Sequence, residues 1–289
     1  ELQVFASDRI AHGLYTWEPY MHNPKLPYRL HRIDIPTLLI IGVMILAGST
    51  SYVVLANIVV IRGWHRLTLD TKLVLLGIGV MLLVGFTAFM ILEWTNPDTT
   101  GNENVRNKVT QAVFHTVNRT AGFSTLDYGK LNFANLSVTE GLMFVGGASA
   151  STAAGIKVST FMVIVIASFA IFSGRERTTV FGREIPRVNV LRAMAVASTA
   201  AAAVLFLAVA LFVVQPDLDF RTGLFEIVSS FGTVGWSAGA TSNLNPAAQV
   251  VVAVTMFAGR FGPLTIALFM AGRERQDSVR FAMERIRIG

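Results

Sequence analysis

The sequence predicts an all-α membrane protein built from tandem repeats, each with a short re-entrant loop between two helices. Its composition is the first reason: 53% of the 289 residues are hydrophobic and 15% are charged, whereas soluble domains carry about 25% charged residues. Several apolar stretches reach the ~18 residues that favour a membrane-spanning helix. Two motifs also recur at one spacing, which is the pattern of an internal repeat.

Four apolar stretches are long enough to span a membrane as single helices. They cover residues 35–61, 73–92, 190–214 and 247–270. Two further apolar segments, 111–117 and 224–231, are too short to span. Each of them follows one span and precedes a polar loop and another apolar stretch, so both are expected to dip into the membrane from the outer side.

The stretch 136–172 is too long for one span. As a continuous helix it would measure about 55 Å, against a hydrocarbon core of ~30 Å. The run "GGASASTAAGIK" interrupts it, so the sequence predicts a broken helix with a loop inside the membrane. A run of small residues can also form a close helix-packing surface, and the length of the stretch favours the break.

Basic residues gather in the loops on one side of the predicted spans. The positive-inside rule places such loops in the cytoplasm. We therefore expect a multi-pass protein of the cell inner (plasma) membrane, with its Arg-rich loops and C-terminus cytoplasmic. This topogenic role accounts for the net charge of +6 without nucleic acid, while binding of anionic membrane lipid or of a cytosolic partner by the same arginines stays open.

Two motif pairs define the internal repeat. "AGFS" matches "VGWS", and "MFVGG" matches "MFAGR". Gly235 follows Gly122 by 113 residues, and Gly259 follows Gly146 by the same number. Two motifs at one offset indicate duplicated units rather than chance.

Irregular backbone at these positions has a physical use. Within hydrocarbon, non-helical backbone is tolerated where it is buried in protein or lines a water-filled cavity. An extended segment that contains glycine can direct a row of carbonyls at an axis, where they replace the water around a cation. The short helix before it points its partly negative end toward the membrane centre, which favours a cation there. A re-entrant loop that binds no ion is the alternative.

The candidate filter residues belong to the two glycine-containing turns. The triplet "TVG" in the second turn is also the first part of the potassium-channel filter sequence. We expect backbone oxygens of both turns to bind K+ as the transported ion. The first turn contributes Asn118, Thr120, Ala121, Gly122 and Phe123, and the second contributes Gly232, Thr233, Val234, Gly235 and Trp236.

These motifs resemble those of the Trk/Ktr/HKT superfamily of potassium transporters, and within it the KtrB/TrkH type of membrane subunit. The match is carried by "NRTAGFST" with "GGASASTAAGIKVSTF" and by "GTVGWS" with "MFAGRFGPLT", and it covers most of residues 35–289. The resemblance implies tandem helix–pore loop–helix repeats, potassium-channel-like, around a central pore. Residues 1–69 would then be the end of the second, incomplete repeat, 70–186 the third repeat with the broken inner helix, and 187–289 the fourth. Trp236 stands where the family more often has Phe or Asn.

By the same resemblance, the chain is the ion-translocating subunit of a potassium uptake system, driven by the membrane potential. Dependence on Na+ stays open, and no organic cofactor is expected in this chain. The subunit would form a homodimer and bind a cytosolic nucleotide-binding regulatory ring of the RCK/KTN type. A non-conducting membrane anchor for such a ring is the alternative function. An enzyme is not expected, because the sequence holds no cysteine, Walker loop, catalytic triad or carboxylate pair.

Small and basic residues below the filter are expected to form a gate. Arg260 would lie about 21 Å along a helix that starts near Pro246, and an intramembrane cation is a functional candidate. It either helps to close the pore or binds carbonyls and holds the broken helix in place. Arg119 is expected to clamp the filter loop, because a cation repels the ion. The candidate gate residues are Gly146, Gly147, Ser149, Ser151, Thr152, Gly155, Lys157 and Arg260.

Overall fold

The computed structural model describes residues 35–61, 63–175 and 177–271, so most of the expected second-repeat segment, up to residue 34, lies outside the described residues. The contacts reported below lie within the compact unit that begins at Gly42. This part of the chain is mostly helical. The helices are α3 (Ile35–Ser49), α4 (Tyr52–Val60), α5 (Leu69–Leu92), α6 (Val105–Val117), α7 (Phe133–Phe144), α8 (Val158–Phe172), α9 (Arg187–Val214), α10 (Phe220–Phe231) and α11 (Pro246–Ala271).

Short elements complete the described chain. Between α8 and α9, β1 (Thr179–Val180) pairs antiparallel with β2 (Arg183–Glu184). Single 3-10 turns cover Trp64–Arg66, Tyr128–Lys130 and Thr241–Asn243.

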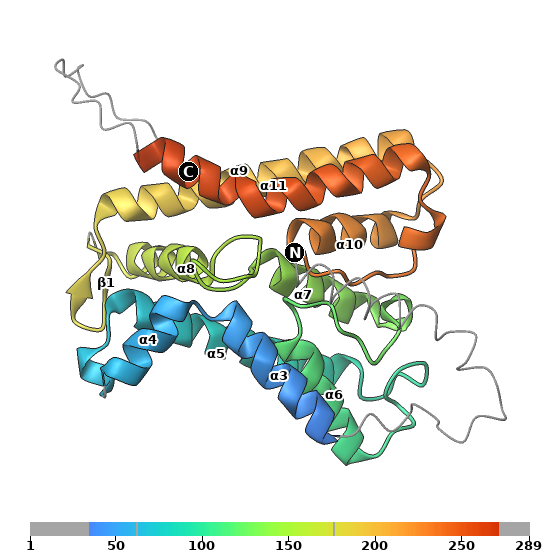
Figure 1. The fold of residues 1–289 in the computed structure, drawn as a ribbon, viewed down its shortest axis with the longest axis horizontal. Helices are drawn as coiled ribbons and strands as arrows, with labels where there is room; N and C mark the ends of the chain where they lie inside the picture. Colours follow the sequence, from blue (N-terminus) through green and yellow to red (C-terminus); the bar gives the residue numbers. More distant parts are fainter. Residues whose placement is uncertain (1–34, 62, 176, 272–289) are drawn as a thin grey trace. The chain divides into compact units, whose positions relative to one another are not determined.

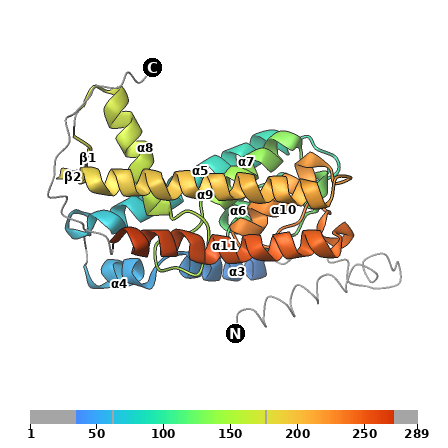
Figure 2. The same cartoon turned by 90° about the horizontal axis from the view of Figure 1, so that it is seen from above.

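The helices form two groups of similar order. α5 packs against α6, α7 and α8, and α9 packs against α10 and α11. Figure 1 shows α9 and α11 side by side with α10 next to them, and Figure 2 shows the same α9–α11 pair from above. Contacts of α7 with α10 and of α8 with α9 join the two groups.

Within the described residues, α5 and α9 are each long and apolar enough to cross a membrane. Their starts follow from the sequence. The Thr68 hydroxyl accepts the N–H of Thr71 at the start of α5, and the Asp219 carboxylate does the same for Thr222 at the start of α10. Such N-caps satisfy a backbone donor that the helix itself leaves without a partner.

The expected single helix over residues 35–61 is two helices. α3 ends at Ser49, α4 begins at Tyr52, and the two are bent by 97°. The hydroxyl of Ser51 accepts the N–H of Val53 and caps the second helix. The sequence did not reveal this bend, because Ser and Thr are also tolerated inside apolar helices, where they bond to their own preceding turn.

The stretch 136–172 is divided between two helices. α7 ends at Phe144 and α8 begins at Val158, with residues 145–157, here called the break loop, between them. Neither helix is long enough to fill a ~30 Å hydrocarbon core by itself at 1.5 Å per residue.

One apolar core joins the two helix groups around α10. Ala112, Met143, Leu211 and Phe225 come from α6, α7, α9 and α10, and each is 0% exposed. The C-terminal half of α10, residues 225–231, is buried throughout. This short helix is therefore surrounded by protein, the setting in which a non-spanning segment is tolerated at membrane depth.

Candidate functional site

Two loops follow the short helices α6 and α10. The first loop (residues 118–127) and the second loop (residues 232–240) carry the predicted filter motifs, and both lie outside regular helix and strand. Gly122 has a φ of 73° and Gly235 a φ of 94°. Both values lie in the left-handed region, which glycine enters without the penalty that a Cβ brings. The repeated glycine therefore has the same type of conformation in both copies.

The two loops touch each other. A Cβ on Gly122 would lie 2.1 Å from the carbonyl oxygen of Val234, so the close approach requires glycine. The indole Nε1–H of Trp236 donates a hydrogen bond of 2.9 Å to the carbonyl oxygen of Phe123. A Cβ on Gly235, by contrast, would meet nothing within 4 Å. The fold thus brings together two motifs that stand 113 residues apart.

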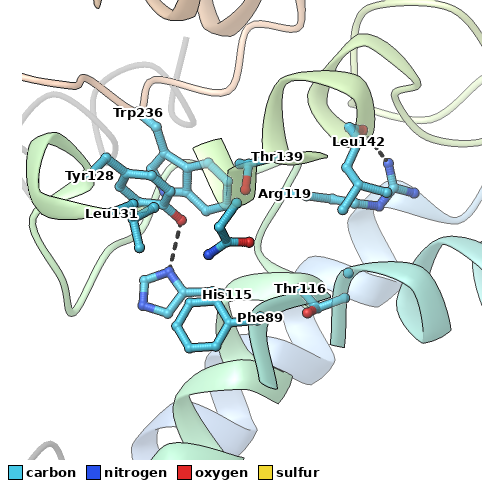
Figure 3. Close-up of a pocket in the computed structure, with 11 residues that line it drawn as sticks. Phe89, His115, Thr116, Arg119, Tyr128, Leu131, Thr139, Leu142 and Trp236 are labelled. Atoms are coloured by element: carbon cyan, nitrogen blue, oxygen red, sulfur yellow. Dashed lines mark hydrogen bonds between the residues drawn. The ribbon is translucent and has the colours of Figure 1, made fainter. Parts of the chain in front are cut away.

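A buried cluster of rings lies behind the first loop (Figure 3). His115 on α6 forms hydrogen bonds through both ring nitrogens, Nδ1 with the Tyr128 hydroxyl at 2.8 Å and Nε2 with the Thr125 hydroxyl at 2.9 Å. Trp236 stacks on Tyr128, with ring centroids 4.3 Å apart. A cavity of about 20 Å³ lies among these rings and Arg119, which is room for about one water molecule.

The second loop is held by a carboxylate. Glu226 on α10 is 4% exposed. Its Oε1 accepts a hydrogen bond from the Ser237 hydroxyl, and its Oε2 accepts one of 2.8 Å from the Thr241 hydroxyl. The Ser237 oxygen in turn accepts the N–H of Gly239 at 3.1 Å. Each carboxylate oxygen therefore has a hydroxyl partner, as a buried charge requires.

The break loop satisfies its own backbone. The N–H of Gly146 donates to the carbonyl of Ile156 at 2.8 Å, and the N–H of Val158 donates to the carbonyl of Gly147 at 3.0 Å. A Cβ on Gly146 would lie 1.7 Å from the carbonyl oxygen of Ala154. Glycine is therefore what lets the two sides of the break loop pair closely.

The bend between α3 and α4 supplies further acceptors to the break loop. The carbonyl of Ser49 accepts the N–H of Ala148 at 2.9 Å. The carbonyl of Gly48 accepts both the N–H of Thr152, at 3.2 Å, and its hydroxyl, at 3.0 Å. A helix end leaves such carbonyls without intrahelical partners, so the bend and the break loop satisfy each other.

Arg119, in the first loop, is 5% exposed and reaches the end of α7. Its Nη1 donates to the carbonyls of Leu142 at 3.0 Å, of Gly146 at 3.2 Å and of Val145. Figure 3 shows its side chain directed at Leu142, away from Trp236. The guanidinium thus ties the first loop to the start of the break loop.

The other two basic residues also bind carbonyls of the break loop. Lys157 Nζ donates to the carbonyl of Ala153 at 2.6 Å, and Arg260 Nη1 donates to the carbonyl of Thr152 at 2.6 Å. The two cations therefore meet the break loop at neighbouring carbonyls, one from within the loop and one from α11.

Gly259 connects the second loop to the same place. A Cβ on it would lie 1.8 Å from the carbonyl oxygen of Phe231, the last residue of α10. Its own carbonyl accepts the N–H of Gly155 at 3.4 Å, and Gly155 has a φ of 74°. Of the remaining predicted gate residues, Ser149 has its hydroxyl 3.2 Å from that of Ser159.

The sequence did not single out His115, Tyr128 or Glu226 as site residues. A signal was present for one of them, since Glu226 is the only acidic residue between Phe220 and Phe231 in an otherwise apolar segment. The roles of His115 and Tyr128 depend on contacts across the fold, which no local pattern marks. Within the described part of the chain, no group of three or more His, Asp or Glu side chains could hold a metal ion.

Comparison with known proteins places the chain in a family. Residues 34–280 match the family model TrkH, described as cation transport protein. The Ktr system potassium uptake protein B of Bacillus subtilis (strain 168) is 35% identical over 244 residues, which cover 84% of this chain and 54% of that protein. The potassium/sodium uptake protein NtpJ of Enterococcus hirae is 29% identical over 259 residues, 87% of this chain and 57% of that protein.

A solved structure has a similar fold. The potassium transporter TrkH from Vibrio parahaemolyticus aligns with a TM-score of 0.65 at 18% identity, over 84% of this chain and 53% of that chain. The chain thus spans about half the length of the curated relatives it matches.

The matched family consists of membrane proteins that transport cations and not of enzymes. This agrees with an apolar sequence that lacks a catalytic constellation, and with the resemblance carried by its two motif pairs. The family model covers most of the chain, and the two glycine-containing loops lie inside the match. This chain therefore belongs to the TrkH family of cation transport proteins.

Proposed function

We propose that the chain conducts K+ across the membrane through a filter lined by backbone carbonyls, as the translocating subunit of a potassium uptake system. Residues 70–186 and 187–289 are two successive pore repeats in this proposal, and residues 1–69 end a preceding one. α5 begins at Leu69 and α9 at Arg187, close to these boundaries. In each repeat a long helix is followed by a short buried one and then by a glycine-containing loop.

The observation that carries the proposal is the contact between the two loops. Each has its repeated glycine at positive φ, and the Gly122 backbone approaches Val234 too closely for any side chain. Paired loops of this kind can direct carbonyl oxygens at a shared axis, where they replace the hydration shell of a cation. The C-terminal ends of α6 and α10 precede the loops, and their partial negative charge favours a cation there. A membrane potential of 100 mV adds about 2.3 kcal/mol per charge as driving force.

The break loop is the proposed gate, as the broken inner helix of the third repeat. Arg260 holds it through the carbonyl of Thr152, so the structural role of this arginine has a direct contact behind it. At about 10 Å from a K+ ion, its charge would also repel the ion by about 1.7 kcal/mol at an effective dielectric near 20. That repulsion slows an ion without blocking it, so closure requires the loop itself to move.

The setting of the protein follows from the charge pattern and from the family. The Arg-rich loops face the cytoplasm in this proposal, in a cell inner membrane, with the subunit as a homodimer that binds a cytosolic nucleotide-binding ring. Coupling to Na+ belongs to the proposal as a question for measurement, since the name of the Enterococcus relative includes both ions.

Ion flux tests the proposal directly. The full-length protein is placed in liposomes with a K+ gradient, and uptake of K+ and of Na+ is followed separately. We expect K+ flux that exceeds Na+ flux and that rises with an inside-negative potential. A protein that binds a cytosolic ring but passes no ion would instead be the non-conducting anchor.

The gate has its own test. Arg260→Ala should release the Thr152 carbonyl and raise K+ flux under conditions in which the unaltered protein is closed. Unchanged flux in both the open and the closed condition would remove Arg260 from the gate.

A further inference from the structure

We infer that Trp236 is a positioning residue for ion selection: its indole N–H fixes the first loop against the second and so resists collapse of the filter around a smaller cation. The inference rests on the proposed function and adds to it the contact that sets the spacing of the two loops.

The contact is made between equivalent positions of the two repeats. Trp236 follows Phe123 by the same 113 residues that separate Gly235 from Gly122. The Nε1–H of Trp236 donates to the Phe123 carbonyl oxygen at 2.9 Å. A phenylalanine ring has no donor, so the bond runs in one direction, from the second loop to the first.

The donor is held in place by packing. Trp236 is 3% exposed, and its ring stacks on Tyr128 with centroids 4.3 Å apart. Tyr128 is fixed in turn by its hydrogen bond with His115 at 2.8 Å. The indole therefore has little freedom to follow the carbonyl if the first loop moves.

The accepting carbonyl is committed to the protein. The Phe123 oxygen also accepts a hydrogen bond from the side-chain amide of Asn118. A carbonyl oxygen has two lone pairs, and the two donors occupy both. This oxygen therefore serves as an anchor for the first loop, and ion binding falls to the carbonyls that precede it, those of Thr120, Ala121 and Gly122.

An anchor next to the filter matters for the choice between K+ and Na+. Dehydrated Na+ is smaller, so carbonyls must move inward to replace its water as well as they replace that of K+. The crosslink from Trp236 to Phe123 opposes such movement at the outer end of the loops. Its removal should help Na+ more than it harms K+.

The test is Trp236→Phe in the full-length protein, assayed in liposomes for K+ and Na+ flux. The variant keeps an aromatic ring against Tyr128 and loses the N–H. We expect the K+/Na+ flux ratio to fall about fivefold, the factor that corresponds to one ordinary hydrogen bond. A matched control is Trp94→Phe, since Trp94 lies over Lys108, away from the two loops, and it should leave the ratio unchanged.

A second variant separates positioning from folding. Replacement of Trp236 by benzothienylalanine keeps the two fused rings and removes only the N–H donor, and it should lower the flux ratio to the same extent without changing the unfolding temperature. An unchanged ratio in this variant, or a lower unfolding temperature with an unchanged ratio, overturns the inference. Failure of the unaltered protein to pass K+ would instead reject the proposed function.

Discussion

The first and second loops share a backbone conformation but are fastened by different chemistry. Each has a glycine at positive φ at the same place in the repeat. The first loop is held by neutral rings, through His115 and Tyr128, and the second by the carboxylate of Glu226. The backbone geometry is thus the repeated feature, and the side chains that support it differ between the copies.

The difference extends to the residue that faces the end of α7. In the first loop Arg119 binds carbonyls at that end. The matching residue of the second loop is Gly232, where a Cβ would lie 2.8 Å from the carbonyl of Met143. One copy therefore reaches α7 with a long cation, and the other packs its backbone directly against it. A pore built from such unlike repeats can be altered one loop at a time.

The largest expected difference lies between the two repeated glycines. Gly122→Ala places a Cβ 2.1 Å from a carbonyl oxygen and also strains a residue at positive φ, whereas Gly235→Ala brings the φ strain alone. The strain costs roughly 1–2 kcal/mol, and overpacking adds roughly 1–3 kcal/mol. Gly122→Ala should therefore lose far more K+ flux in liposomes than Gly235→Ala. Equal losses would show that the loops do not touch as described.

Arg119 comes next in size. Arg119→Met leaves up to three buried carbonyls without their donor, and we expect the free energy of unfolding to fall by roughly 3 kcal/mol. Thermal unfolding in detergent measures this loss. Arg106→Met removes an exposed arginine from the preceding helix α6 and should have almost no effect. Similar unfolding temperatures for the two variants would contradict the role of Arg119 as a clamp.

Glu226 tests the second loop alone. Glu226→Ala leaves the hydroxyls of Ser237 and Thr241 without their acceptor, which should cost roughly 2 kcal/mol and lower the K+/Na+ flux ratio. Glu226→Gln keeps one acceptor oxygen and should lie between the variant and the unaltered protein. The result to watch is the order of the three flux ratios, since a Gln variant worse than the Ala variant would refute support through accepted hydrogen bonds.

The smallest expected effect concerns Tyr128. Tyr128→Phe keeps the ring against Trp236 and removes the hydrogen bond to His115, so we expect a loss of about 1 kcal/mol in the free energy of unfolding. Tyr52→Phe is a suitable comparison, because Tyr52 is 73% exposed. If the two variants unfold at the same temperature, the ring cluster does not stabilise the first loop.

The sequence predicted the features that are coded locally or by repetition. The division of residues 136–172 followed from length, the ends of α6 and α10 from composition, and the pairing of Gly122 with Gly235 from the repeat. Positive φ at both glycines fits the reason for expecting glycine there. Each of these features is decided by neighbouring residues or by one fixed offset.

Long-range contacts were beyond such reasoning. The bend at Ser49 is stabilised by the N–H of Ala148, and Trp236 binds a carbonyl 113 residues away. Neither partner is near in sequence, and both acceptors are backbone atoms, which every residue carries. The sequence therefore marked the loops but not what fastens them to each other.

Thallium binding tests the central claim most directly, because Tl+ resembles K+ and its anomalous scattering locates it in a crystal. In the full-length protein we predict Tl+ sites between the first and second loops, in contact with the carbonyls that precede Phe123 and Trp236. Tl+ found only outside these loops, in protein that still transports K+, would contradict the account.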